Sequence, residues 1–129
     1  MKVLLDTHAF LWFVLDSPEL PQRARGVIED ASNDVFVSMA SLWEMAIKSS
    51  LGKLHLPIPF DQFIPQHVFL NQMLILPIGV LHLHQVQRLP FHHRDPFDRL
   101  LIAQALVESM PLIGRDATFD LYGIQRIWN

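Results

Sequence analysis

The sequence has no cysteine among its 129 residues. That absence excludes a disulfide framework and thiolate zinc sites, and it fits a protein of the cytoplasm. Long apolar runs are also missing, because the longest, Ala9 to Leu15, falls far short of the ~18 apolar residues that a membrane-spanning helix needs. We therefore expect no membrane segment. We also expect no secretory signal, since Asp6 interrupts the first apolar stretch.

An excess of positive charge is missing as well, since the formal net charge is -3. Proteins that hold nucleic acid by its backbone usually carry a basic surface, because phosphate contacts dominate their affinity. The overall charge therefore does not point to RNA, and any such binding must come from a local patch. The candidate residues for such a patch are Lys48, Lys53, Arg88, Arg94, Arg99 and Arg115.

Apolar residues are what the chain has in plenty. They make up 50% of it, while charged residues make up 18%. This balance is typical of a folded protein and excludes intrinsic disorder. The length is that of one domain, so we expect residues 1–129 to form a single unit.

Short apolar runs alternate with helical patterns along the chain. We predict strands at Lys2–Leu5, Asp34–Val37, Leu74–Leu76, Leu112–Ile113 and near Ile124–Ile127. We predict helices at Thr7–Leu15, Pro21–Ala31, Ser41 up to Gly52, Phe60–Asn71, Val80–Arg88 and Pro96–Ser109. This alternation predicts an α/β fold with a mainly parallel central sheet covered on both faces.

The middle of the chain, Leu54 to Gln87, is almost free of charge, with Asp61 as its single charged residue. It is rich in leucine, isoleucine, phenylalanine and valine, so it is not a linker. We expect this segment to be buried, partly against another subunit.

Two acids follow predicted strands. Asp6 ends the first strand, and Asp116 follows the Leu112–Ile113 strand with two residues between. Ligands of parallel sheets bind at the carboxyl ends of the strands, where both acids are expected. Asp6 as a helix cap and Asp116 as a turn residue are equally good interpretations of each acid taken singly.

Asp98 is more informative. It precedes Leu101 and Ile102 by three and four positions, so it lies on the apolar stripe of its predicted helix. A buried carboxylate needs a partner such as a cation. Asp95 already fills the cap position before Pro96, which weakens the interpretation of Asp98 as a residue that only stabilises the helix N-terminus.

Glu44 is ambiguous on its own. It stands three residues after Ser41 and could close a capping box with it. It also borders the buried side of its helix, and Lys48 could pair with it one turn later. Taken alone, Glu44 is more often structural than catalytic.

A cluster of all four acids has a clear chemical use. Mg²⁺ and Mn²⁺ prefer oxygen ligands, neutralise phosphate charge and lower the pKa of a bound water. Without a cation, four close carboxylates would repel one another. The cluster therefore predicts a metal and, with it, a phosphate substrate.

The acids also stand in motifs of a known family. Asp6 lies in LLDTHAFLW, Glu44 in SxxSLWE, Asp98 in DPFDRLLIAQA and Asp116 in PLIGRDATFDLYGI. In this order, over nearly the whole chain, the sequence resembles PIN-domain proteins, and most closely the VapC-type ribonuclease toxins. The pairing of LLDTH with HHRDPFDRLLIAQA is the specific part.

The resemblance implies a three-layer α/β/α domain and a divalent-metal-dependent endoribonuclease that uses Mg²⁺ or Mn²⁺. Asp6, Glu44, Asp98 and Asp116 match the catalytic and metal-binding acids. It further implies an RNA substrate, a cognate antitoxin, a homodimer and no membrane partner. Such proteins commonly have Thr or Ser two residues before the last acid, where this chain has Gly114, so we expect one metal ion rather than two.

Two other functions remain open. A non-catalytic PIN-fold binding module would keep the fold without the chemistry. A phosphatase or receiver domain with Asp6 as nucleophile is less favoured, because His8 stands where a second acid is wanted. The adjacent His92 and His93 could touch substrate, but a solvated loop explains them better.

Overall fold

The computed structural model describes all 129 residues and contains one five-stranded sheet of order β3-β2-β1-β4-β5. Each neighbouring pair of strands is parallel, which confirms the predicted α/β fold with a parallel central sheet. The strands are β1 (Lys2–Leu5), β2 (Asp34–Ser38), β3 (Leu74–Leu76), β4 (Leu112–Ile113) and β5 (Arg126–Ile127).

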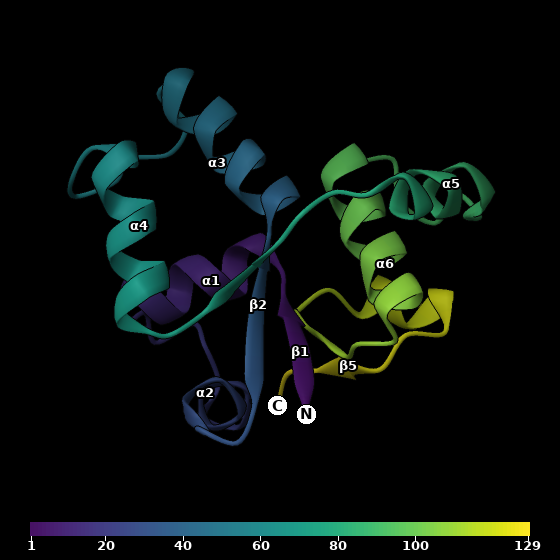
Figure 1. Cartoon of the computed structure of the whole chain (residues 1–129), viewed down its shortest axis with the longest axis horizontal. Helices are drawn as coiled ribbons and strands as arrows, with labels where there is room; N and C mark the ends of the chain where they lie inside the picture. The colour runs from purple at the N-terminus through teal and green to yellow at the C-terminus, as the bar shows by residue number, and fades with distance from the viewer.

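Helices cover the sheet on both faces. Figure 1 shows α1, α2 and α4 on one side of the central strands and α5 and α6 on the other. The helices are α1 (Thr7–Val14), α2 (Gln22–Glu29), α3 (Met39–Ser50), α4 (Phe60–Leu70), α5 (Val80–Arg88), α6 (Pro96–Glu108) and the 3₁₀ helix η1 (Ala117–Tyr122). No helix is both long and apolar enough to cross a lipid bilayer.

Strand β1 supplies both halves of the core. Val3 and Leu5 belong to the apolar cluster that α1, α2 and α4 complete. Leu4, which points to the opposite face, belongs to the cluster completed by α6 and η1. This alternation within a fully buried strand explains why β1 is an uninterrupted apolar run.

The predicted start of the third helix is wrong in detail. Helix α3 begins at Met39, and its cap is Ser38, whose hydroxyl accepts a hydrogen bond from the Ala40 N–H at 2.9 Å. The predicted capping box between Ser41 and Glu44 therefore does not form. Helix α1 begins at Thr7, as predicted, and Asp6 is its cap.

The prediction that the low-charge middle is buried holds only in part within a single chain, where Phe63, Ile64 and Met73 are buried. Phe69, Val80 and Leu81 are 82%, 81% and 69% exposed. Leu74 and Ile75 of β3, a strand at the edge of the sheet, are also exposed. Burial of this surface against another subunit stays a prediction.

The order of the strands positions the acids. The chain leaves β1 toward β2 on one side of the sheet, and β4 pairs with β1 on the other. The carboxyl ends of β1 and β4 are therefore neighbours at the point where the sheet order reverses, which is where open parallel sheets bind ligands. The Asp6 N–H extends this pairing by donating to the Ile113 carbonyl at 3.0 Å.

Replacement of Leu101 by alanine tests the packing of the helix that carries Asp98. Leu101 is 0% exposed, so Leu101→Ala should lower the free energy of unfolding by about 2–5 kcal/mol in urea titrations. The matched control is Leu121→Ala at a site that is 61% exposed, which should change stability by less than about 0.5 kcal/mol. Equal losses in both variants would contradict this assignment of the core.

Candidate active site

A cleft of about 510 Å³ opens at the carboxyl ends of β1 and β4. All four acids predicted from the sequence line it. So does Asp95, together with two basic side chains. The charged residues of the lining are Asp6, Glu44, Lys48, Asp95, Asp98, Arg115 and Asp116.

Asp6 is the most deeply placed acid, with 7% of its surface exposed. Its Oδ1 accepts a hydrogen bond of 2.7 Å from the Ala9 N–H and so caps α1. Its Oδ2 accepts no hydrogen bond within the chain. Burial raises the pKa of Asp6 to about 7. The hydrogen bond from Ala9 lowers this pKa, whereas the negative charges of Asp98, Glu44 and Asp116 raise it further.

Gly114 lies directly against this carboxylate. A Cβ atom built at position 114 would stand 2.7 Å from Oδ2 of Asp6 and 3.1 Å from Cε2 of Phe119. Glycine therefore lets the end of β4 approach Asp6 more closely than any residue with a side chain would. This contact gives a physical reason for the departure from the Thr or Ser of the family pattern.

Glu44 is held by two partners on either side. The Thr7 hydroxyl donates to its Oε1 at 2.7 Å, and the Lys48 ammonium donates to its Oε2 at 2.6 Å. The pairing of Glu44 with Lys48 that the helical spacing suggested is confirmed. Ser41 lies on the other side of Thr7, 2.9 Å from its hydroxyl. These contacts tie α3 to the start of α1.

Asp98 lies half-buried in the first turn of α6. Asp95 caps this helix, as predicted, by accepting hydrogen bonds from the N–H groups of Phe97 and Asp98. Burial raises the pKa of Asp98 to about 6, and the neighbouring charge of Asp95 raises it further than His93 lowers it. Because Asp95 caps α6, the carboxylate of Asp98 does not serve as the cap, and it lines the cleft.

Asp116 caps η1 by accepting a hydrogen bond of 2.9 Å from the Thr118 N–H. Its other oxygen, Oδ2, lies 2.9 Å from Nε2 of His93. Burial acts to raise the pKa of Asp116, but the hydrogen bonds from His93 and Thr118 outweigh it and hold this pKa below its usual range. Asp116 is therefore more readily ionised than Asp6 and Asp98.

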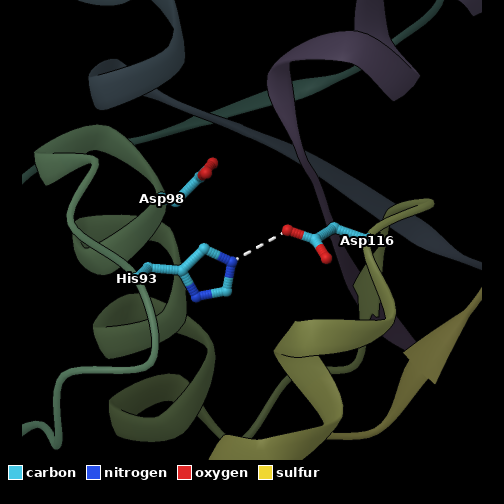
Figure 2. Close-up of side chains that lie close together, drawn as sticks. All are labelled: His93, Asp98 and Asp116. Carbon is cyan, nitrogen blue, oxygen red and sulfur yellow. Dashed lines mark hydrogen bonds and ion pairs between the residues drawn. The ribbon is translucent and has the colours of Figure 1, made fainter.

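His93 is the residue at the site that the sequence prediction missed. Figure 2 shows its imidazole pointing from the loop before α6 toward Asp116, with Asp98 beside it. The expectation of a solvated loop is wrong for this side chain, which is 9% exposed. Its closeness in sequence to Asp98 was the only available signal, since the path of the loop cannot be read from a histidine pair.

Arg99 sets the path of that loop. Its guanidinium donates hydrogen bonds to the carbonyls of Val86, Leu89, Pro90 and His93. Arg99 is buried, so its prediction as part of a basic surface patch is wrong. Lys48 and Arg115, from the same predicted patch, do line the cleft.

Aromatic rings stand at the mouth of the cleft. Trp12 stacks on His8 with ring centroids 5.2 Å apart, and the Arg115 guanidinium lies 4.8 Å from the Trp12 ring centroid. All three side chains line the cleft. The arrangement offers a flat apolar surface beside a positive charge.

Donor atoms in the cleft and beside it fit a divalent cation. His93, Asp98 and Asp116 each offer one ligand atom, and these atoms lie within 4.8 Å of one another. Asp6 and Glu44 line the same cleft without belonging to that tight group. Asp6 is mostly buried, and its Oδ2, which no hydrogen-bond donor of the chain contacts, is the kind of atom that a cation stabilises.

The family assignment follows from the sequence model of the PIN domain, which matches residues 3–124. The chain belongs to the PIN domain family. The match covers both the motif at Asp6 and the motif at Asp116, so the cleft belongs to the PIN domain throughout. The alternative of a phosphatase or receiver domain is thereby overturned.

Individual relatives agree with this assignment. The PIN domain is 34% identical over 66 residues to Ribonuclease VapC16 of Mycobacterium tuberculosis. That match spans 51% of this chain and 45% of the relative, so the chain matches less than half the relative's length.

Solved structures share the fold over the whole chain. VapBC2 from Rickettsia felis, bound to a fragment of promoter DNA, has a TM-score of 0.72 at 14% identity and covers 100% of both chains. FitAcB from Neisseria gonorrhoeae has a TM-score of 0.62 at 19% identity, covering 100% of this chain and 97% of its own. At these identities the likeness establishes the fold alone.

The close approach of Gly114 to Asp6 can be tested with two alanine variants. Gly114→Ala should lower the free energy of unfolding by about 1–3 kcal/mol in urea titrations, because the added Cβ overlaps a carboxylate that cannot move without uncapping α1. Gly26→Ala is the matched control, since nothing lies within 4 Å of its Cβ position. That helical site should gain about 0.5–1 kcal/mol. A Gly114→Ala variant as stable as the parent would contradict the close packing.

Proposed function

We propose that this PIN domain is a divalent-metal-dependent endoribonuclease, the toxin of a toxin–antitoxin pair, with residues 1–129 acting as one nuclease domain. The observation that carries the proposal is the single cleft in which Asp6, Glu44, Asp98 and Asp116 gather beside two basic side chains. The likeness to a relative named as a ribonuclease supports the choice of RNA.

The contacts of the four acids suggest different roles for them. Asp6, Asp98 and Asp116 have oxygen atoms that face the cleft and could hold Mg²⁺ or Mn²⁺. A cation bound there neutralises part of the phosphate charge and acidifies water for attack on phosphorus. Glu44 keeps both of its oxygens on Thr7 and Lys48, and it therefore orients the Lys48 ammonium at the rim of the cleft.

The remaining residues of the cleft suit a nucleic-acid strand. Lys48 and Arg115 lie where they could contact phosphate oxygens, which partly offsets the acidic charge of the chain. Trp12 offers a ring on which a base of single-stranded RNA could stack. The local patch required by the net charge of -3 is thus small and limited to the cleft.

The partners follow from the same proposal. Structural neighbours are named as VapBC complexes, which supports a cognate antitoxin for this chain. The exposed apolar side chains of α4, β3 and α5 support a homodimer, since a monomer would leave them in water. We place the proposed toxin–antitoxin pair in the cytoplasm, which fits the absence of cysteine.

A non-catalytic PIN module is the second candidate. The observation in its favour is that both oxygens of Glu44 are engaged within the chain. A module of this kind would bind RNA or protein through the cleft and leave phosphodiester bonds intact. An assay of RNA cleavage separates the two functions directly.

Neutral replacements of the acids test the catalytic proposal. Purified protein is incubated with mixed RNA and Mg²⁺ or Mn²⁺, and cleavage is followed on denaturing gels. Asp6→Asn and Asp98→Asn should each reduce the cleavage rate by at least about 100-fold, because each removes a charged ligand of the cation. EDTA should abolish cleavage. Asp61→Asn, in α4 and outside the cleft, is the control and should cleave at the parental rate.

Cleavage that continues in both variants or in EDTA would overturn the carboxylate–metal mechanism. Absence of cleavage in the parent protein with either metal, with RNA binding retained, would favour the non-catalytic module.

Arg115 tests the contact with the RNA backbone. Arg115→Ala should weaken the binding of single-stranded RNA and reduce the slope of log affinity against log salt by about 0.7, the value for one lost phosphate contact on a single strand. Fluorescence anisotropy over a salt series measures both quantities. Arg88→Ala, an exposed arginine outside the cleft, should leave the slope unchanged. Equal slopes for Arg115→Ala and the parent would contradict a phosphate contact at this residue.

A further inference from the structure

The loop before α6 brings an imidazole into the carboxylate cluster. We propose that His93 is a nitrogen ligand of the divalent cation, and that the resulting mixed site selects Mn²⁺ over Mg²⁺. The proposal rests on the metal-dependent function above and adds to it the identity of a ligand and of the preferred ion. Acidic motifs alone assign oxygen ligands and give no role to this histidine.

The distances suit ligands of one ion. Nε2 of His93 lies 2.9 Å from Oδ2 of Asp116, and the ligand atoms of His93, Asp98 and Asp116 all lie within 4.8 Å of one another. Metal–ligand distances of ~2.1 Å at right angles place neighbouring ligand atoms about 3 Å apart, and opposite ligand atoms about 4.2 Å apart. Small side-chain rotations are enough to bring the three groups onto one cation.

The imidazole is held in place before any ion binds. The backbone N–H of His93 donates a hydrogen bond to the Tyr122 hydroxyl at 2.8 Å. The imidazole ring packs against the rings of Phe119 and Tyr122, with centroid distances of 5.1 and 5.6 Å. Arg99 fixes the carbonyls of the same loop. The position of the ring therefore depends on neighbours that belong to the core. The His93 side chain would lose little conformational entropy on binding a cation.

The second ring nitrogen has a suitable partner. Nδ1 of His93 lies 3.3 Å from the Tyr122 hydroxyl, which can accept or donate a hydrogen bond. Because the Asp116 carboxylate only accepts, Nε2 carries the proton while it contacts Asp116. With the proton on Nδ1 and donated to Tyr122, Nε2 presents its lone pair to the cluster. Histidines that bind metals usually donate their other N–H to an oxygen in this way.

An independent observation points to a cation at this place. Asp6, which is 7% exposed, lines the same cleft, and its Oδ2 accepts no hydrogen bond within the chain. Asp98 and Asp116 add further negative charge around it. An imidazole ligand shifts the preference of such a cluster, because nitrogen donors suit transition metals whereas Mg²⁺ favours oxygen.

Electron spin-echo spectroscopy of Mn²⁺ tests the proposal without relying on activity. The full chain, with Mn²⁺ below one equivalent, should show the ¹⁴N modulation of a coordinated imidazole. His93→Gln, which retains a polar side chain, and His93→Phe, which retains the ring packing, should both lose this modulation. Calorimetry should show their preference for Mn²⁺ over Mg²⁺ reduced roughly 10- to 100-fold.

His92→Gln is the matched control. The His92 ring meets Tyr122 edge-on at 4.9 Å and stands in the same loop, outside the tight group of ligand atoms. This variant should keep the ¹⁴N modulation and the parental metal preference. Thermal unfolding of each variant establishes that the fold is retained, and either folded His93 variant is sufficient for the test.

Three results would overturn the proposal: bound Mn²⁺ without ¹⁴N modulation in the parent, modulation that survives in a folded His93 variant, or no Mn²⁺ binding at all. The proposed nuclease is judged separately by RNA cleavage. Parental cleavage in Mg²⁺ without ¹⁴N modulation in Mn²⁺ refutes the His93 ligand and leaves the nuclease. Modulation without cleavage supports the ligand and refutes the nuclease.

Discussion

The carboxylate of Asp6 lies mostly buried at the end of the central strand, and much of the neighbouring structure accommodates it. The backbone N–H of Asp6 continues the pairing of β1 with β4, and Oδ1 of Asp6 caps α1. These two bonds fix the carboxylate, so β4 can continue past it only because Gly114 has no side chain. The remaining oxygen is left facing the cleft. Burial without a partner is costly, and this cost is what a cation in the cleft would relieve.

Capping and ligand binding are compatible roles for these acids. Asp6, Asp95 and Asp116 each cap a helix, and each lines the cleft. In a parallel α/β fold the helices begin where the strands end, so helix N-termini gather at the carboxyl edge of the sheet. Their N–H groups hold one carboxylate oxygen and leave the other available. The sequence left open whether each of these acids caps a helix or binds a ligand, and the two roles do not exclude one another.

The sequence predicted what depends on local pattern. The fully apolar run before Asp6 identified β1, and the position of Asp98 on an apolar stripe predicted that it faces inward. The place of His93 depends instead on Arg99 and Tyr122, which hold its loop through contacts that no periodicity reveals. The start of α3 was misplaced by two residues because Ser38 and Ser41 both suit a cap, and only the pairing of Ser38 with Leu76 in the sheet shows where β2 ends.

The cleft is proposed to bind a cation and RNA, and the binding of the two is coupled by electrostatics. Lys48 is paired with Glu44, and Arg115 with Glu19, so each basic side chain at the cleft already has a carboxylate partner with which a phosphate would compete. Five carboxylates line the same space and repel an RNA backbone. Under the proposed function, a bound cation is then needed for RNA to enter as well as for the chemistry. A cation held by His93 and two carboxylates keeps more of its positive charge than one held by three carboxylates, because imidazole is neutral. His93 would therefore favour the binding of Mn²⁺ over Mg²⁺ and also the approach of the phosphate.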